Sequence, residues 1–231
     1  MTIRPLILFL LAVAPPVVAP SAARAAPPAK SPAPQTRGLY LQLIGQARSD
    51  GRPRAALAYL DDFDKRFPGD VGAQVLRVNS LLDLGQVDEA ERIVAALAKV
   101  QGNATVDAVR GHALAARGHW REASERYQAA VAASPADPLL RNALGYAQLR
   151  AGEGDSAIEE LRGACDLAPG ETVIRNNLLL AYAVTGRKQE LSAGIRTTGN
   201  RKAQAELLRT ITTEAKRIAR EPALPGKENG R

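Results

Sequence analysis

Apolar residues recur through the middle of the chain at the 3.6-residue period of an amphipathic helix, in pairs of stripes separated by a glycine. Residues 138–171 show this pattern most clearly, with Gly152 between the two stripes and Pro169 after the second. Glycine readily ends a helix and proline stops one, so this segment is predicted to be two helices folded back as a hairpin. The stripes consist of Leu140, Ala143, Leu144 and Ala147, and of Ala157, Ile158, Leu161 and Ala164.

The hairpin pattern repeats along the sequence. Gly118, Gly152 and Gly186 lie 34 residues apart, as do Gly51 and Gly85, whereas the step from Gly85 to Gly118 is 33 residues. Each hairpin leaves an apolar face that only a neighbouring unit can cover, so a repeat of this length predicts a stacked solenoid. The same 34-residue shift relates Gly111 to Gly145, Ala123 to Ala157, Ala130 to Ala164 and Pro135 to Pro169.

With Leu-Gly in the first helix, Gly at the turn, and Ala, an aromatic residue, Ala and Pro in the second, the units resemble the tetratricopeptide repeat (TPR). The resemblance implies an all-α fold, a right-handed superhelix of helical hairpins. It covers five units, residues 37–70, 71–103, 104–137, 138–171 and 172–200. The residues that carry it are Gly111, Gly118, Ala123, Tyr127, Ala130 and Pro135 in the third unit, and Leu144, Gly145, Gly152, Ala157, Ala164 and Pro169 in the fourth.

The outermost units depart from the repeat, as the terminal units of a stack do. The first has Ile44 in place of the helix-packing Gly, and the fifth has Leu191 where Ala is expected. Residues 201–220 predict a further helix that caps the last hairpin and completes a folded region over residues 37–220. Prolines and glycines follow, so we expect residues 221–231 to form a disordered tail.

The first 25 residues are typical of a secretory signal peptide. Arg4 precedes the apolar run 6–19, and small residues lead up to Ala25. The run is shorter than the roughly 17 to 25 residues of a membrane-spanning helix. We expect cleavage after Ala25, a linker rich in Pro and Ala over residues 26–36, and a periplasmic protein. Cys165 is the only cysteine, so no cysteine follows the cleavage site to carry a lipid, and we expect no lipoprotein.

A narrower resemblance concerns residues 173–187. This segment is similar to the TadD component of tight-adherence (Flp) pilus assembly. The resemblance implies a role in assembling a pilus. Members of that family are commonly lipoproteins, and this chain departs from them because it lacks the cysteine that carries the lipid.

Composition limits the chemistry that the chain can perform. Of its 231 residues, 45% are hydrophobic and 4% are aromatic, which favours helices packed through Ala, Leu and Val. A single cysteine excludes an internal disulfide framework. With only two histidines, His112 and His119, beside it, the chain has few ligands for a zinc site. The chain contains no glycine-rich phosphate-binding motif. We therefore expect no enzymatic activity, no cofactor and no bound metal.

The formal net charge of +7 is concentrated toward the C-terminal end. Residues 187–231 contain 11 Lys and Arg against five Asp and Glu. This segment has no aromatic side chain to stack on bases, so we do not expect a nucleic-acid partner. Two interpretations remain: a solvated basic capping helix, or a weak contact with an anionic membrane surface or an acidic partner, without stable membrane insertion.

The TPR resemblance also implies a concave groove lined by the first helix of each unit. Asparagine at such a position can bond a peptide backbone as both donor and acceptor, and a tyrosine adds apolar area. The resemblance implies that the second, fifth, ninth and twelfth residues of each unit, counted from its first residue, face the groove. They predict a partner-binding set of Asn79, His112, Asn142, Tyr146, Leu149, Asn176 and Leu180.

These features predict an exported, non-enzymatic adaptor or scaffold that binds a protein or peptide partner during assembly of a pilus, secretion or envelope system. One alternative is an architectural or oligomerising scaffold whose groove holds no ligand. Another is an accessory subunit of an envelope polysaccharide or peptidoglycan enzyme.

We expect the exported protein to begin at Ala26 or within a few residues of it, without an attached lipid, because small residues at positions 23 and 25 suit signal peptidase. Intact mass spectrometry of the protein purified from its cells measures this directly. A mass that includes Met1, or an added diacylglycerol, would contradict the processing predicted from the sequence.

Overall fold

The computed structural model describes residues 34–221, and the described chain is entirely helical outside its turns. The predicted signal peptide (1–25), linker residues 26–33 and tail residues 222–231 lie outside the described residues. The helices are α1 (Pro34–Ser49), α2 (Pro53–Asp64), α3 (Val71–Asp83), α4 (Val87–Ala96), the 3-10 turn η1 (Leu97–Lys99), α5 (Ala104–Ala116), α6 (Trp120–Ala133), α7 (Pro138–Arg150), α8 (Gly154–Leu167), α9 (Thr172–Val184), α10 (Lys188–Arg196) and α11 (Arg201–Arg220).

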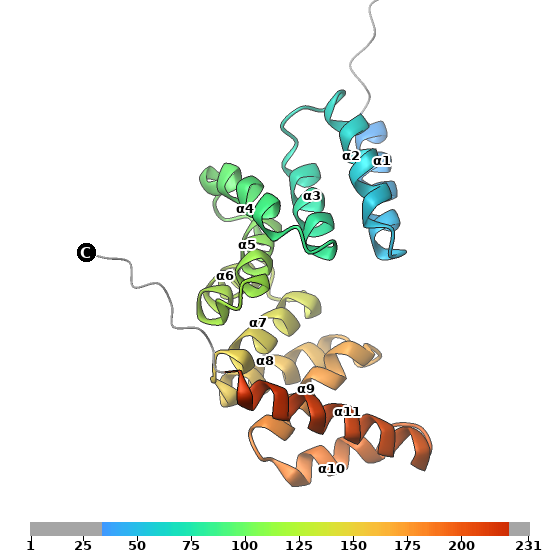
Figure 1. Cartoon of the computed structure of the whole chain (residues 1–231), viewed down its shortest axis with the longest axis vertical. Coiled ribbons are helices and arrows are strands. Elements are labelled where there is room, and N and C mark those ends of the chain that lie inside the picture. The colour runs from blue at the N-terminus through green and yellow to red at the C-terminus, as the bar shows by residue number, and fades with distance from the viewer. Residues whose placement is uncertain (1–33, 222–231) are drawn as a thin grey trace, which may run out of the picture.

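Helices α1 to α10 form five successive hairpins that stack into a curved solenoid, and α11 lies against the last of them (Figure 1). This confirms the predicted all-α TPR solenoid with a C-terminal capping helix. One boundary differs from the prediction. α1 begins at Pro34, so the last residues of the predicted linker 26–36 are helical. Proline suits the first turn of a helix because its φ is already helical. It lacks a backbone N–H, but an N–H in the first turn would have no acceptor within the helix.

The glycine at each hairpin turn explains the 34-residue period. Gly118 ends α5 with a φ of 80°, a left-handed conformation that side chains with a Cβ disfavour. Its N–H donates to the carbonyl of Ala115, and the N–H of His119 donates to that of Leu114, which is the bonding pattern of a Schellman cap. The equivalent glycines at positions 51, 85, 152 and 186 also have positive φ.

Within a hairpin, the two helices cross closely at small residues. A Cβ on Gly145 of α7 would stand 2.7 Å from Cγ of Leu161 and 3.0 Å from the carbonyl oxygen of Ala157 in α8. A Cβ on Gly111 of α5 would meet the ring of Tyr127 in α6 at 2.6 Å. Gly145 and Ala157 therefore mark a close crossing of α7 and α8.

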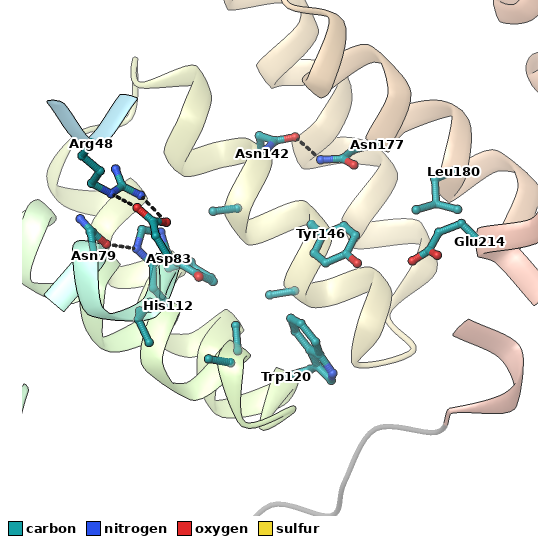
Figure 2. Close-up of a pocket in the computed structure, with 16 residues that line it drawn as sticks. Arg48, Asn79, Asp83, His112, Trp120, Asn142, Tyr146, Asn177, Leu180 and Glu214 are labelled. Carbon is teal, nitrogen blue, oxygen red and sulfur yellow. Dashed lines mark hydrogen bonds and ion pairs between the residues drawn. The ribbon is translucent and has the colours of Figure 1, made fainter. Parts of the chain in front are cut away.

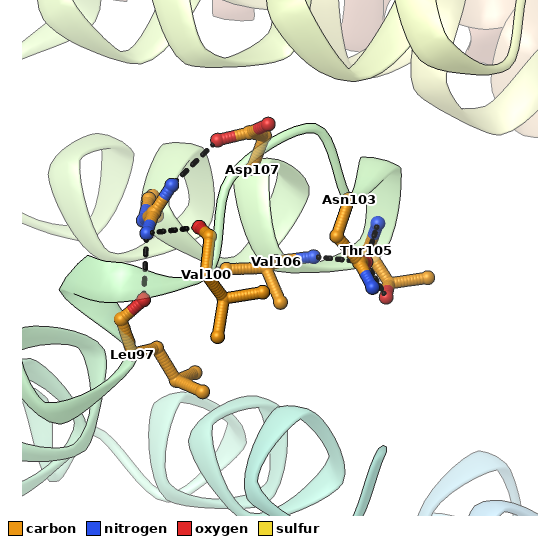
Figure 3. A network of polar contacts seen from close by, with 7 residues as sticks. Leu97, Val100, Asn103, Thr105, Val106 and Asp107 are labelled. Carbon is orange, nitrogen blue, oxygen red and sulfur yellow. Dashed lines mark hydrogen bonds and ion pairs between the residues drawn. The ribbon is translucent and has the colours of Figure 1, made fainter. Parts of the chain in front are cut away.

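The 33-residue step falls at the junction between the second and third hairpins, where η1 directly follows α4 (Figure 3). Arg110 of α5 donates to the carbonyls of Leu97 and Val100 at 2.7 and 2.8 Å. Its guanidinium also pairs at 2.8 Å with Asp107, which is buried. Asn103 caps the start of α5 through its side-chain oxygen. The shortened junction is therefore held by polar contacts instead of the proline found in other units.

The capping helix α11 buries one face against α9 and α10. Ile211 and Ile218 join an apolar cluster with Leu179 of α9 and Leu191 of α10. Just beyond α11, the carboxylate of Glu221 lies 3.6 Å from the guanidinium of Arg150 at the end of α7. No helix between residues 34 and 221 has the length and apolar character needed to cross a membrane.

Gly145→Ala should lower the free energy of unfolding by about 1 to 3 kcal/mol, because the new methyl group overlaps Leu161 and backbone atoms of α8. Gly163→Ala is the matched control, since a Cβ there would come no closer than 3.7 Å to Arg141. Alanine is the better helix former, so the control should raise stability by up to about 1 kcal/mol. Urea denaturation compares the two, and stabilisation by both would contradict the close crossing.

Candidate functional site

The first helices of the hairpins line a groove of about 680 Å³ along the inner side of the solenoid (Figure 2). Helices α3, α5, α7 and α9 supply most of its wall, α6 adds two aromatic side chains, and α1 and α11 contribute one residue each. The lining residues are Arg48, Asn79, Leu82, Asp83, His112, Ala115, Ala116, Trp120, Tyr127, Asn142, Ala143, Tyr146, Ala147, Asn177, Leu180 and Glu214.

At the N-terminal end of the groove, charged and polar side chains bond to one another across units. The guanidinium of Arg48 in α1 pairs with the carboxylate of Asp83 in α3 at 2.6 Å. The Nδ1–H of His112 in α5 donates to Oδ1 of Asn79 in α3 at 2.9 Å. Because Arg48 is the one cation among the lining residues and is paired, this end of the groove carries no free positive charge.

The middle of the groove presents a pair of amides. Nδ2 of Asn177 in α9 donates to Oδ1 of Asn142 in α7 at 2.8 Å (Figure 2). This bond leaves the amino group of Asn142 and the carbonyl of Asn177 without partners among the described residues. The pair therefore offers one free donor and one free acceptor, which can bond a carbonyl and an N–H of a peptide backbone.

Aromatic rings form an apolar section beside the amide pair. The rings of Trp120 and Tyr146 meet edge to face, with centroids 5.8 Å apart. The guanidinium of Arg150 lies 4.2 Å from the centroid of Trp120, so it covers part of the indole ring. Tyr127 is buried beneath His112, and burial raises the pKa of its hydroxyl. This section suits an apolar side chain of a ligand.

Five of the seven residues predicted to face the groove line it: Asn79, His112, Asn142, Tyr146 and Leu180. Leu149 does not, because it is 2% exposed and packs in the apolar cluster that α9, α10 and α11 share. Asn176 does not line it either, and Asn177 takes its place. Neighbouring residues on a helix point about 100° apart, so an error of one position changes the side chain that reaches the groove.

Several lining residues were not predicted from the sequence. Trp120 was available as the chain's only tryptophan, but it lies at the start of a second helix, which the family pattern does not assign to the groove. The ion pair between Arg48 and Asp83 could be predicted from the sequence, because the two residues lie near the C-terminal ends of first helices in adjacent units. Glu214 belongs to the capping helix, where no repeat position indicates its direction.

The described part of the chain contains two histidines, His112 and His119, and one cysteine, Cys165, as candidate metal ligands or nucleophiles. No cluster of three or more His, Cys, Asp or Glu among residues 34–221 could hold a metal ion. His112 lies in α5, whereas His119 precedes α6 at the turn. Cys165 is partly buried, and burial raises the pKa of its thiol, which disfavours the reactive thiolate.

A second hollow of about 620 Å³ lies beside α4, α5 and α6. Its polar lining includes Asp107 and Arg110, and both already hold the shortened junction described above. The polar side chains of this hollow therefore already have a structural role in that junction.

The pKa of His112 is lowered to about 4, chiefly by burial and also by the nearby charge of Arg48, while the carboxylate of Asp83 partly offsets both effects. The unfolded chain takes up this proton near pH 6.5 and the folded chain only near pH 4. The free energy of unfolding should therefore be highest above pH 6.5 and fall by up to about 3 kcal/mol as the pH drops toward 4.

Denaturation curves between about pH 7 and pH 4.5 measure this loss, a window above the range in which most carboxylates titrate. His112→Gln should flatten the dependence, whereas His119→Gln should keep it. An unchanged slope in His112→Gln would contradict the assignment to the buried groove histidine.

Family models and solved structures agree on the architecture. Two models described as tetratricopeptide repeat match the chain, one over residues 47–113 and one over residues 109–172. Together they span residues 47–172, more than half of the 231-residue sequence. A search of curated proteins found no match to the sequence.

Three similar solved structures illustrate the fold. TTC0263, a thermophilic TPR protein of Thermus thermophilus, is 24% identical with a TM-score of 0.62, covering 80% of this chain and all of its own. MamA from Desulfovibrio magneticus RS-1, from residue 41 to its end, is 24% identical with a TM-score of 0.51, and the match covers 78% of this chain and 95% of that one.

YrrB, described as a TPR protein with an unusual peptide-binding site, is 18% identical with a TM-score of 0.51. The match covers 77% of this chain and 90% of YrrB. At these identities the likeness concerns the fold. The repeat period, the stacked hairpins and the family models lead to one conclusion: the chain is a tetratricopeptide repeat protein.

Proposed function

We propose that the protein is an exported, non-enzymatic adaptor that holds an extended segment of a partner protein in its inner groove during assembly of an envelope system. The observation that carries this proposal is the amide pair Asn142 and Asn177, which lies beside the aromatic section of a groove built from four successive first helices.

The amide pair supports recognition of a peptide backbone. The free amino group of Asn142 can donate to a peptide carbonyl, and the free carbonyl of Asn177 can accept from a peptide N–H. Such bonds do not depend on the ligand's side chains. Each contributes about 0.5 to 1.5 kcal/mol, so the pair fixes register and leaves sequence preference to the rest of the groove.

The aromatic section supports an apolar anchor in the ligand. Trp120 and Tyr146 line the groove next to the small residues Ala143 and Ala147, which leave room above them. Aromatic residues in such pockets commonly supply much of the affinity of a binding surface. The preferred ligand is therefore an extended segment with an apolar side chain near the amide pair.

The charges of the groove favour an internal segment over a free C-terminus. A clamp for a terminal carboxylate needs unpaired cations, and Arg48 is bound to Asp83. At the other end of the groove, Glu214 interacts with Arg217. With its charges paired, the groove selects its ligand through hydrogen bonds and apolar contacts.

The envelope assignment has separate support. The N-terminal sequence has the pattern of a cleaved signal peptide, and residues 173–187 are similar to TadD of tight-adherence pilus assembly. YrrB, a structural neighbour, is described as having a peptide-binding site. An adaptor in a periplasmic pilus or secretion system is consistent with these features.

A photo-crosslinking amino acid at position 146 should capture the partner in intact cells, whereas one at exposed Glu159 on α8 should not. The captured segment, synthesised as a labelled peptide, then gives a Kd for each variant by fluorescence anisotropy. Asn142→Ala with Asn177→Ala should raise the Kd about 5- to 150-fold, because two backbone bonds are lost. Tyr146→Ala should weaken binding by removing the anchor.

Asn176→Ala is the matched control for this experiment, since Asn176 is adjacent in sequence and does not line the groove. It should change the Kd by less than about twofold, and circular dichroism should show unaltered helicity in all variants. Unchanged binding by the Asn142 and Asn177 double variant would refute the groove assignment and favour an architectural scaffold.

A further inference from the structure

A straight row of four cationic side chains runs along the exposed face of the capping helix α11. Lys202, Arg209, Lys216 and Arg220 are all exposed. The first three are spaced by seven residues, and seven residues fall within about 20° of two full helical turns. Arg220 follows four residues after Lys216, on the same side. The row extends over about 27 Å at 1.5 Å per residue.

The row faces away from the solenoid. Ile211 and Ile218, which pack against α9 and α10, are two residues beyond Arg209 and Lys216, about 200° around the helix. Figure 1 shows α11 lying along the last hairpin at the end of the stack, which leaves its other side uncovered. The two faces of α11 therefore have different partners: one packs on the protein and the other meets the surroundings.

None of the four cations takes part in an ion pair within residues 34–221. Arg217 on the same helix differs, because it binds both Glu214 and Glu221. Glu206 borders the row but forms no ion pair with it. The adjacent cations Arg196 and Arg201 are also exposed and unpaired. Unneutralised positive charge thus accumulates on one side of the molecule, although ion pairs are plentiful elsewhere in the fold.

We propose that this row docks the protein on a bilayer surface rich in anionic phospholipid. A straight row suits a flat array of headgroups, and no lysine or arginine of α11 lines any hollow described above. Leu208 is 41% exposed beside the row and can enter the headgroup region. Helices α10 and α11 contain no aromatic side chain for stacking on bases.

Docking in this orientation leaves the groove accessible. Glu214, the α11 residue that lines the groove, lies about 140° to 160° around the helix from Arg209 and Lys216. A surface held by the row therefore contacts the side of α11 turned away from the groove. The inference does not rest on the proposed peptide ligand, because it uses different residues and a different face.

Co-sedimentation with vesicles tests the proposal on the protein as purified from its cells. One set of vesicles contains phosphatidylcholine alone, and the other contains about one third phosphatidylglycerol, both at about 0.1 M salt. The protein should bind the anionic vesicles, remain unbound with the zwitterionic ones and be released at about 1 M salt, where charges are screened within a few ångströms.

The row variant combines Lys202→Gln, Arg209→Gln, Lys216→Gln and Arg220→Gln, and its partition coefficient on anionic vesicles should fall at least about tenfold. The matched control combines Arg54→Gln, Arg92→Gln, Lys99→Gln and Arg121→Gln. These four cations are also exposed and form no ion pair with any described residue, but they lie on separate elements. The control removes the same charge and should lose less than about threefold.

A milder variant, Arg209→Gln with Lys216→Gln, should give an intermediate loss. It provides the same test if the quadruple variant fails to fold. Equal losses in the row and control variants would overturn the proposal, since net charge alone would then explain binding. Absence of binding to the anionic vesicles would also overturn it. So would row-dependent binding of polyglutamate or duplex DNA that is tighter than binding to vesicles, because the row would then serve an acidic macromolecule.

Discussion

The fold depends on how closely two helices of a hairpin approach each other. In the fourth hairpin the approach is fixed where Gly145 meets Leu161 and the backbone at Ala157, and a single methyl group would not fit there without movement. Close packing of this kind makes each hairpin a rigid unit, so its remaining apolar face must be covered by the next unit. Stacking then brings the first helices side by side on the inner surface, and the groove results from that arrangement.

The groove shows how polar side chains can be kept in a small-residue interior. Asn142 bonds Asn177, and Asn79 bonds His112, in each case between adjacent units. These bonds satisfy part of each side chain and orient what remains toward the groove. The same pairs thus contribute to the alignment of the units and, under the proposed function, hold the binding surface in one arrangement before a ligand arrives.

The sequence predicted the repeat more securely than the site. Gly118 and Gly152 appear at a fixed spacing because the turn requires positive φ, a local property that any sequence comparison detects. No local property of this kind identifies the residues that line the groove. Asn176 and Asn177 are both asparagines, and only packing between α7 and α9 decides which one reaches the groove. Leu149 was misplaced because α11, which lies outside the repeat pattern, helps to bury the end of α7.

Glu214 gives the capping helix a second role, since it lines the groove as well as belonging to the cap. Residues inside the repeats are constrained by the 34-residue register, because each must fit two neighbouring units. α11 has a neighbour on one side only and follows no repeat. A substitution at Glu214 therefore changes the wall of the groove at a position that is not shared between two neighbouring repeat units.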